Sequence, residues 1–176
     1  MTELRTERLT LRPWREADLA PWAAMNADPE VREFLGEPLT RERADASVAV
    51  FQAEFAARGY GWWAVEVTAT GEFIGFAGLD DVEDWAPFTG VEIGWRLARS
   101  AWGHGYATEA ARAVLAFGFE TLGLAEILAV TTATNTRSRA VMARLGMTRD
   151  PADDFDDLDF PEGPLRPNVV YRLRKP

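Results

Sequence analysis

The stretch AWGHGYATEA, residues 101–110, holds two glycines that flank one histidine where a strand-like run gives way to a helical pattern. A helix N-terminus leaves its first amide N–H groups unpaired and carries a partial positive charge, which suits a phosphate or pyrophosphate. Each amide bonded to a charged oxygen contributes roughly 1.5–3 kcal/mol, so several convergent amides can hold a diphosphate without a lysine. A plain strand-to-helix turn with Gly105 at positive φ explains the glycines equally well, and this stretch alone leaves both interpretations open.

Other nucleotide-binding and nucleophilic motifs do not fit this chain. A dinucleotide-binding fingerprint needs a third glycine where this sequence has Thr108. The single lysine, Lys175, cannot serve a Walker A loop, and the single histidine, His104, lies inside the glycine turn, where a histidine-based triad is not expected. The sequence contains no cysteine, which excludes disulfides, thiolate metal sites and a thiol nucleophile. Any nucleotide phosphate must therefore be held by the main chain.

Glu92 is a candidate general base. It alternates with Val91 and Ile93 in a strand-like run, so it projects from the opposite face of the sheet. Gly94 lies beside it, and its missing side chain is expected to leave space for a substrate. A carboxylate there can accept a proton from an attacking amine, directly or through water. A solvated carboxylate at a sheet edge is the competing interpretation.

Ser138 is a second candidate. It precedes Val141, Met142 and Leu145 by helical spacings, so it shares their apolar face and needs a polar partner. Its hydroxyl can bond back to the carbonyl of Thr134, or it can serve a reacting group. The residues alone do not decide between these roles.

Hydrophobic periodicity predicts the elements that position these residues. Strands are predicted at residues 8–12, 62–67, 72–79, 90–97, 127–132 and 169–174. Helices are predicted at about 18–26, from Thr40 to Gly59, at 107–122 and at 136–145. The strand at 90–97, the following helix and the strand at 127–132 form a right-handed parallel crossover. We therefore expect an α/β (α+β) fold with a mixed central sheet, antiparallel in its N-terminal part, and helices on both faces.

Length and composition fit one globular domain spanning residues 1–176. The formal net charge of −9 opposes non-specific nucleic-acid binding, which relies on a basic surface. No apolar run reaches membrane-spanning length, and the first nine residues lack a signal-peptide core. We therefore expect a cytoplasmic protein without a nucleic-acid or membrane partner.

Two longer segments carry a resemblance to a known family. The segment VEIGWRLARSAWGHGYATEAARAVLAFGFETLG, residues 91–123, is followed by TNTRSRAVMARLGM, residues 134–147. Together they resemble the GNAT superfamily of acetyl-CoA-dependent N-acetyltransferases, and most closely its ribosomal-protein N-terminal acetyltransferase-like branch. The resemblance covers nearly the whole chain and implies a GNAT-like sheet with acetyl-CoA as cosubstrate.

The resemblance implies a cofactor site made largely of main chain. The amides that would wrap the pyrophosphate of coenzyme A are those of Gly103, His104, Gly105, Tyr106, Ala107 and Thr108. Trp95, Arg96 and Leu97 would pair with the pantetheine amides in the manner of an added strand. Asn135 matches the asparagine that contacts the cofactor arm near its reactive end.

The chain departs from the family pattern at two positions. Ser100, with Arg99 one place earlier, stands where the family has Gln or Arg, so a side-chain phosphate contact is not expected there. Met142 stands where many members have the tyrosine that protonates the departing thiolate, and a methionine cannot donate a proton. The ribosomal branch places a serine at position 138, which implies that Ser138 bonds the thiolate.

The base and the acceptor are less sharply defined by the resemblance. Many relatives have a base at the strand position of Glu92, whereas the base of the ribosomal branch can come from elsewhere, so Asp156 and Glu162 are reserve bases. An α-amine is about 2.5 pKa units easier to deprotonate than a lysine side chain, worth roughly 3.5 kcal/mol, and suits one weak carboxylate base better. A small-molecule amine of depressed pKa remains equally open. Residues expected to line the acceptor pocket are Phe34, Leu35 and Trp85.

The acidic run DPADDFDDLDFPEG, residues 150–163, does not match a calcium loop, because Asp159 stands where the required glycine belongs. No metal site is therefore expected. The run either forms a solvated mobile loop or attracts a cationic acceptor through its negative charge.

These observations predict direct acetyl transfer from acetyl-CoA to a primary amine, either a protein N-terminal α-amine or a small molecule, in a ternary complex. A non-catalytic acyl-CoA-binding regulatory module with the same fold is the alternative. The sequence leaves open the acceptor, the acyl-chain preference and the oligomeric state, a homodimer included.

Overall fold

The computed structural model describes residues 2–82 and 86–175, which form nine strands and five α-helices. The strands are β1 (Leu4–Arg5), β2 (Leu9–Arg12), β3 (Trp62–Val67), β4 (Glu72–Val82), β5 (Gly90–Leu97), β6 (Glu126–Thr132), β7 (Thr148–Arg149), β8 (Phe155–Asp156) and β9 (Pro167–Arg174). The helices are α1 (Leu19–Ala27), α2 (Pro29–Arg32), α3 (Arg41–Arg58), α4 (Tyr106–Ala116) and α5 (Thr136–Arg144). None of the described helices has the length and apolar character needed to cross a bilayer.

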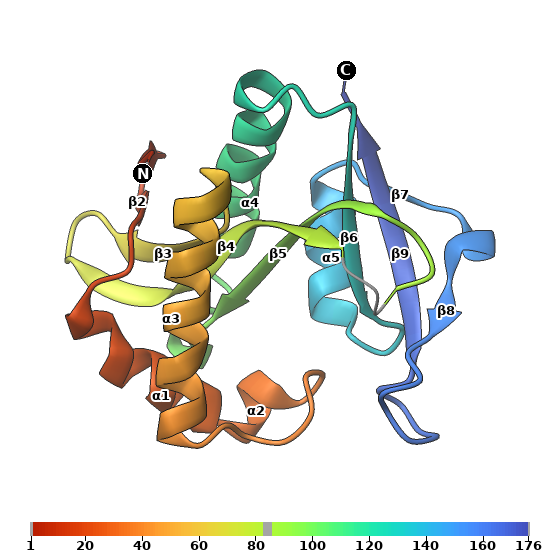
Figure 1. Ribbon diagram of the computed structural model, residues 1–176, viewed down its shortest axis with the longest axis horizontal. Helices are drawn as coiled ribbons and strands as arrows, with labels where there is room; N and C mark the ends of the chain where they lie inside the picture. Colours follow the sequence, from red (N-terminus) through yellow and green to blue (C-terminus); the bar gives the residue numbers. More distant parts are fainter. Residues whose placement is uncertain (1, 83–85, 176) are drawn as a thin grey trace.

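The strands form one mixed sheet in the order β1-β2-β3-β4-β5-β6-β9-β7, with β8 paired to β9. Among the described residues, β5 and β6 are the parallel pair and all other pairs are antiparallel. The α4 helix connects β5 to β6, so the predicted fold class and parallel crossover are confirmed. The register of β5 against β6 consists of one pair in the described chain, Glu92 opposite Leu128. The two strands diverge beyond it (Figure 1).

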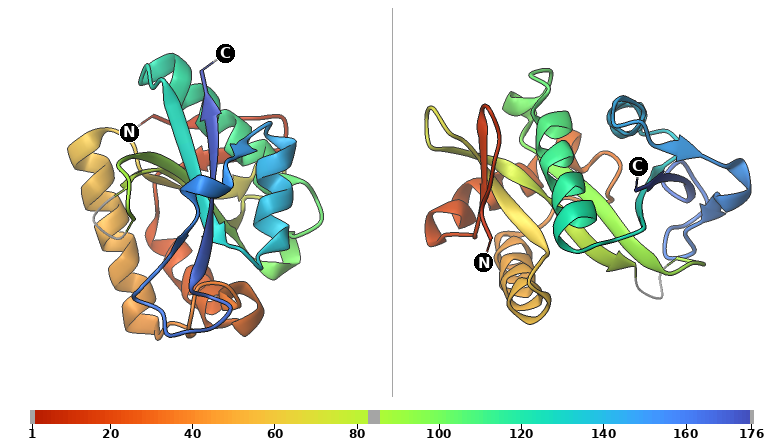
Figure 2. Two further views of the ribbon diagram at one scale, coloured as in Figure 1. Left: turned by 90° about the vertical axis from the view of Figure 1, so that its right-hand side faces the viewer. Right: turned by 90° about the horizontal axis from the view of Figure 1, so that it is seen from above.

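Helices cover both faces of the sheet, as predicted, with α3 and α4 on opposite sides (Figure 2). On one face, α1 and α3 pack over a core that includes Trp22, Trp62 and Phe76. On the other face, α4 buries its apolar stripe against a core that includes Trp63 and Ile93. The two faces of β5 therefore belong to different environments, and alternate residues of this strand serve different parts of the site.

The long helix α3 begins and ends where the sequence predicts. The hydroxyl of Thr40 accepts a hydrogen bond from the N–H of Arg43 at 3.3 Å, which caps the first turn. Gly59 follows the last turn with a left-handed φ of 79°. The Thr40 cap and the left-handed glycine depend on neighbouring residues alone, so both ends of α3 can be predicted from the sequence.

The helix after the glycine turn ends earlier than predicted. The apolar spacing extends to Leu122, but α4 ends at Ala116 and residues 117–121 form a π-helical turn. Gly118 packs so closely on β6 that an added Cβ would lie 2.6 Å from Cδ1 of Ile127. Three-four spacing does not reveal a turn widened by one residue, and the close packing of Gly118 is a tertiary feature.

The acidic connection between β7 and β9 is more ordered than the sequence suggests. It contains β8 and a short turn at Pro151–Asp153. Asp153 forms an ion pair with Arg172 of β9 at 2.7 Å, and Asp154 pairs with Arg149. These contacts and the pairing of β8 hold residues 153–156 against β9, while most of the rest of the run is exposed to solvent, as predicted.

Candidate active site

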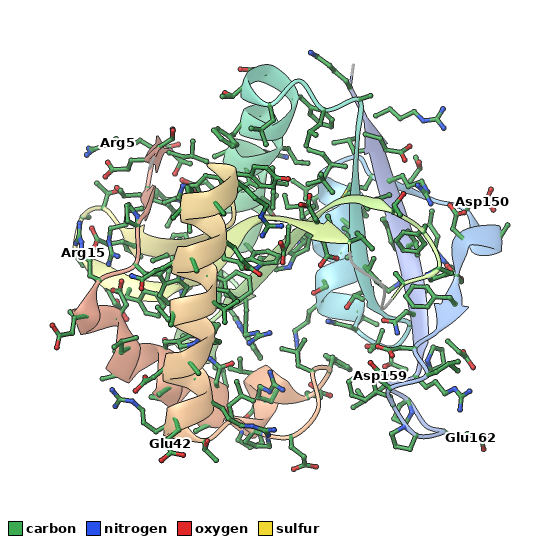
Figure 3. All side chains as sticks on the ribbon, in the orientation of Figure 1. Arg5, Arg15, Glu42, Asp150, Asp159 and Glu162 are labelled. Atoms are coloured by element: carbon green, nitrogen blue, oxygen red, sulfur yellow. The ribbon has the colours of Figure 1, made fainter. Side chains whose placement is uncertain are left out.

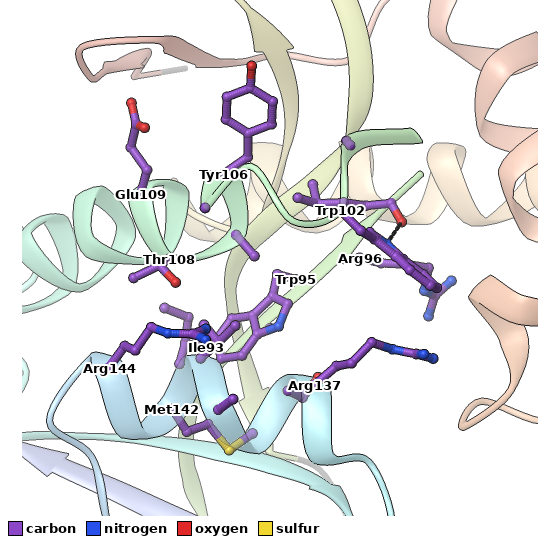
Figure 4. A pocket seen from close by; sticks show the side chains of 18 of the residues that line it. Ile93, Trp95, Arg96, Trp102, Tyr106, Thr108, Glu109, Arg137, Met142 and Arg144 are labelled. Carbon is purple, nitrogen blue, oxygen red and sulfur yellow. Dashed lines mark hydrogen bonds between the residues drawn. The ribbon is translucent and has the colours of Figure 1, made fainter. Parts of the chain in front are cut away.

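A cleft of about 1480 Å³ opens where β5 and β6 diverge. It is lined by the second half of β5, the turn before α4, the first turns of α4, the end of β6 and one face of α5 (Figure 4). The residues predicted as the base, as the thiolate partner and as cofactor contacts all line this cleft: Glu92, Trp95, Arg96, Leu97, Gly103, His104, Gly105, Tyr106, Ala107, Thr108, Asn135 and Ser138. The fold thus brings two sequence segments together along one continuous surface.

The glycine turn presents unpaired amides to the cleft. Gly103 and Gly105 both have left-handed φ angles, 80° and 79°, and α4 begins at the next residue, Tyr106. No described residue accepts a hydrogen bond from the main-chain N–H groups of residues 103–108. An anion can therefore bind these amides without displacing a protein group, which favours the anion-site interpretation over a plain turn.

The outer side of the turn is held by Arg8. Its Nη1 donates to the carbonyl oxygen of His104 at 3.0 Å, and its Nη2 lies 2.6 Å from a carboxylate oxygen of Glu109. The guanidinium also lies over the ring of Tyr106, 4.7 Å from its centroid. These contacts occupy carbonyl and side-chain groups and leave the amides free, so they fix the shape of the turn.

Among the arginines that line the cleft and that the sequence interpretation missed, two have no ion pair with a described residue. Arg112 lies on α4, one turn after Thr108, and Arg144 extends into the cleft from the end of α5 (Figure 4). Neither forms an ion pair with a described carboxylate. Helical spacing places Arg112 near the turn and was the one available signal; Arg144 is brought there by tertiary packing. Arg99, by contrast, pairs with Glu30 at 2.6 Å and does not line the cleft.

The edge of β5 beyond Glu92 is open toward β6. Trp95, Arg96 and Leu97 pair with β4 on one side, and the described part of β6 provides no register partner on the other. Peptide groups along such an edge can pair with an extended chain of amides. The second half of β5 therefore offers a place for a ligand that hydrogen-bonds like a strand.

Glu92 lies on this strand in a half-buried position. Burial, and to a smaller extent the nearby charge of Asp80, together raise the pKa of its carboxyl to about 8. The Asp80 carboxylate is itself held by Arg58, with Nη2 at 2.6 Å from Oδ1. No described residue forms a hydrogen bond with the Glu92 carboxylate. This carboxyl therefore titrates near neutral pH and is free to exchange a proton with a ligand.

The expected space at Gly94 is not there. A Cβ at this position would lie 2.9 Å from ring atoms of Trp62, so the glycine accommodates the indole of β3 and not a substrate. The prediction of a substrate gap at Gly94 is therefore wrong, because a bulky side chain on another strand fills it. Trp62 itself lines the cleft.

Asn135 and Ser138 form one hydrogen-bonded unit at the start of α5. Oδ1 of Asn135 accepts the N–H of Ser138 at 3.1 Å, and Nδ2 donates to Oγ of Ser138 at 3.2 Å and to Oγ1 of Thr131 at 2.9 Å. Because Oγ of Ser138 accepts from Asn135, its own proton can be donated elsewhere. No back-bond from Ser138 to Thr134 is formed. The Asn135 side chain keeps one lone pair of Oδ1 for another partner.

Alternative proton donors and bases are less well placed. Met142 is 2% exposed and packs in the core beneath α4. Tyr60 donates to Asp81, and the hydroxyl of Tyr171 accepts from Arg139; neither tyrosine lines the cleft. Tyr106 points away from Trp95 and Met142 (Figure 4).

The reserve carboxylates lie outside the cleft. Asp156 is exposed and pairs with Arg166 at 3.2 Å, and Glu162 is exposed at the far end of the loop that follows β8 (Figure 3). Phe34 and Leu35, expected at the acceptor pocket, do line the cleft. Trp85, expected there as well, lies outside the described residues.

Comparison with known proteins gives consistent matches over most of the chain. The family model described as "Acetyltransferase (GNAT) domain" matches residues 8–148. An Aspergillus fumigatus protein named FsC-acetyl coenzyme A-N(2)-transacetylase is 33% identical over 190 aligned residues, covering 98% of this chain and 80% of that protein.

Solved structures share the fold. An acetyltransferase from Agrobacterium tumefaciens superposes with a TM-score of 0.81 at 32% identity, covering 99% of this chain and 95% of the other. A ribosomal L7/L12 alpha-N-protein acetyltransferase in complex with coenzyme A superposes with a TM-score of 0.78 at 15% identity, with 98% of both chains covered. At that identity the second likeness concerns the fold alone.

Proposed function

This chain belongs to the acetyltransferase (GNAT) domain family and is an acyltransferase, and from that premise we propose that it transfers acetyl from acetyl-CoA directly to a primary amine. One observation carries the proposal. A single cleft has a cluster of unpaired amides at residues 103–108 and, farther along β5, a carboxyl whose pKa is raised to about 8. Direct transfer in a ternary complex needs a site that binds the phosphates of the acetyl donor and a base that titrates near neutral pH. Both lie on the surface of this cleft.

The cleft fits coenzyme A by the chemistry of its groups. The free amides of the glycine turn would bind the pyrophosphate, with Arg112 and Arg144 supplying positive charge. The open edge of β5 at Trp95–Leu97 would hold the pantetheine arm by strand-like pairing. Asn135 would reach the arm through the remaining lone pair of Oδ1. When bound, acetyl-CoA supplies the activated acetyl group as a thioester.

Glu92 would act as the general base. The proton leaves the acceptor nitrogen for the Glu92 carboxylate, directly or through water, as the nitrogen lone pair forms the N–C bond to the acetyl carbon. The C–S bond breaks, and its electron pair stays on sulfur. A carboxylate whose pKa lies near 8 is a much stronger base than an ordinary glutamate, so it is better matched to an amine.

Ser138 would stabilise the departing sulfur. Its Oγ accepts a hydrogen bond from Asn135, which leaves its O–H free to donate to a thiolate. Met142, at the position of the family's tyrosine, has no proton to donate. The arrangement therefore supports stabilisation by a hydrogen bond in place of protonation by a phenol.

The acceptor class follows from the strength of the base. A protein N-terminal α-amine or a small-molecule amine of low pKa needs less help from Glu92 than a lysine side chain does. The name of the fungal relative specifies acetyl coenzyme A and transfer at an N(2) position, which supports a small-molecule amine as well. The structural likeness to an alpha-N-protein acetyltransferase concerns the fold and does not favour the peptide.

The proposal is tested by measuring free thiol release from acetyl-CoA over a panel of amines and peptides, alongside calorimetry with coenzyme A. Enzyme activity predicts heat of binding and thiol release that depends on the acceptor. Binding with no turnover for any acceptor would favour the non-catalytic acyl-CoA-binding module. No binding would refute the cofactor site altogether.

A further inference from the structure

Arg96 lies on the same face of β5 as Glu92 and lines the same cleft. Its guanidinium is held rigidly from below. Nη1 donates to Oδ1 of the buried Asn26 at 2.7 Å, and the group lies over the rings of Trp22 and Phe76, 5.4 Å and 5.3 Å from their centroids. The side chain is thus fixed on the cleft wall and does not sweep through solvent.

The positive charge of Arg96 has no counter-ion in the described chain. No described carboxylate pairs with it, its Nε is buried without a partner, and Nη2 forms no hydrogen bond with a described residue. Burial, and to a smaller extent the like charge of Arg32, together lower the pKa of the guanidinium to about 9.

Arg32 adds a second positive charge close to Arg96. It donates to the carbonyl oxygens of Leu35 at 2.6 Å and Glu37 at 3.1 Å, and it has no ion pair with a described carboxylate. Two guanidinium groups therefore lie close together with neutral oxygens as their partners. Like charges placed together out of water are costly unless an anion joins them.

Two of the other described arginines that line the cleft are neutralised, whereas Arg112 and Arg144 form no ion pair with a described carboxylate. Arg8 pairs with Glu109, and Arg137, which points toward the same end of the cleft as Arg96 in Figure 4, pairs with Glu33 at 2.6 Å. Arg96 differs from Arg112 and Arg144 because those two side chains are exposed to water, whereas Arg96 is half-buried and its Nε is buried without a partner. A half-buried charge of this kind is the one for which a bound anion compensates most.

We propose that Arg96 binds an oxyanion of the acceptor, so that the acceptor is a small amine that carries a carboxylate or a phosphate. This inference rests on the proposed acetyltransferase function, and it adds the charge of the acceptor. Residues four apart on a strand are separated by roughly 13 Å at Cα, so the amine near Glu92 and the oxyanion near Arg96 are several bonds apart. A planar guanidinium binds such groups with paired hydrogen bonds.

The test compares acceptors that differ in the anion alone. Straight-chain ω-amino acids and short oligoglycines are each assayed as the free acid and as the amide, with aminoalkyl phosphonates of similar length as a second anionic series. The acids or phosphonates should have kcat/KM about tenfold or more above the amides, as expected for one charge-assisted contact. Equal values for charged and neutral acceptors would overturn the inference while leaving acetyl transfer intact.

Variants of Arg96 test whether its side chain causes the preference for anionic acceptors. Arg96→Gln should bring the ratio of acid to amide close to one, and Arg96→Lys, which keeps the charge, should retain part of it. Arg41→Gln is the matched control, because Arg41 is exposed on α3 and pairs with Asp45. A ratio that is unchanged in Arg96→Gln would count against the proposal.

A binding measurement separates this inference from the proposed function. The protein saturated with coenzyme A is titrated with the acid and the amide of each pair by calorimetry. Tighter binding of the acid, lost in Arg96→Gln, supports the anion site even if no amine is acetylated. Equal binding of acid and amide contradicts it whether or not turnover is seen.

Discussion

Asp80 and Glu92 stand directly opposite each other on the antiparallel strands β4 and β5. The charge of Asp80 is one of the two causes that raise the pKa of Glu92 to about 8, and burial is the larger. Arg58 fixes Asp80 by an ion pair of 2.6 Å, so the helix α3 helps to set the proton affinity of the candidate base. The pKa of Glu92, which lines the cleft, therefore depends on Asp80 and Arg58, which do not line it.

Activity should rise with pH up to about 8, because Glu92 can accept a proton only in its ionised form. Glu92→Gln keeps the shape but not the basicity, and it should lower kcat/KM by roughly 10²–10⁴ and flatten this rise. The measurement is kcat/KM against pH with a weakly basic acceptor whose own titration lies well below this range. Glu7→Gln, which changes another carboxylate lining the cleft, should keep the wild-type profile. A full rate and an unchanged profile in Glu92→Gln would remove Glu92 from the mechanism.

Asp80→Asn should move the rate–pH profile toward lower pH. Removing the charge opposite Glu92 takes away one cause of its raised pKa and leaves the positive charge of Arg58 nearby. The shift is read from the same kinetic titration. Glu72→Gln, an exposed change on the same strand, serves as the control. A profile that stays in place would mean that burial alone sets the pKa of Glu92.

Glu92 should also make the free protein less stable as pH rises. Its carboxyl titrates at about 4.5 when unfolded and at about 8 when folded, so the folded state binds more protons between these values. Stability contributed by this group is therefore lost as pH rises through that window. Glu92→Gln should raise the melting temperature at about pH 9 by several degrees, at roughly 2–4 °C for each kcal/mol recovered, with little change at about pH 4. Thermal melts of both proteins without ligand provide the measurement. If Glu92→Gln and the wild type melt at the same temperature at each pH, the prediction is contradicted.

Ser138→Ala should slow turnover about tenfold, the loss expected for one hydrogen bond to a charged group, while coenzyme A affinity stays largely intact. Asn135→Asp keeps the helix cap but loses the Nδ2 donor to Ser138, so it should preserve stability and lower kcat. Asn135→Ala loses both functions and should cost about 1 kcal/mol of stability. Chemical denaturation and kcat, measured for all three variants, separate the capping role from the orienting role. If Asn135→Asp turns over like the wild type, Ser138 does not depend on that donor.

Arg112→Gln combined with Arg144→Gln should weaken coenzyme A binding about tenfold and reduce its salt dependence, because two positive charges near the phosphates are removed. Calorimetry at two ionic strengths provides the measurement. Arg41→Gln again serves as the control, since it removes one positive charge far from the cleft. Unchanged affinity would leave the phosphates to the main-chain amides alone.

Local signals in the sequence were sufficient for most of the architecture. The bounds of α3, β3, β5 and α5 are predicted closely. The signals are the Thr40 cap, the glycines that follow the helices, the three-four spacing of apolar residues in helices and their alternation in strands. The short elements β1, α2, β7 and β8 were not predicted, because segments of two to four residues carry no periodicity of their own.

The sequence located the residues of the candidate site, but it did not reveal their surroundings. Each residue predicted from the two family motifs lines one cleft, because these motifs are contiguous segments, whereas the reserve bases Asp156 and Glu162 do not line it. The neighbour that perturbs Glu92 comes from another strand, and the space expected at Gly94 is filled by Trp62 from a third. The sequence also does not show that Arg96 contacts Asn26 and has no ion pair with a described carboxylate. Such relationships depend on cross-strand register and on which side chains are left without partners.

In the described part of β5 and β6, the single parallel register pair of Glu92 and Leu128 gives the sheet the form of a wedge whose apex is the candidate base itself. Ser138 is carried by α5 beyond the open end of the other arm, where Asn135 ties it to Thr131. A small rotation of one arm about the apex therefore swings the serine hydroxyl through a larger arc than it moves the carboxylate. The angle of the wedge therefore sets the position of the proposed thiolate partner, whereas the proposed base lies at its vertex whatever that angle is.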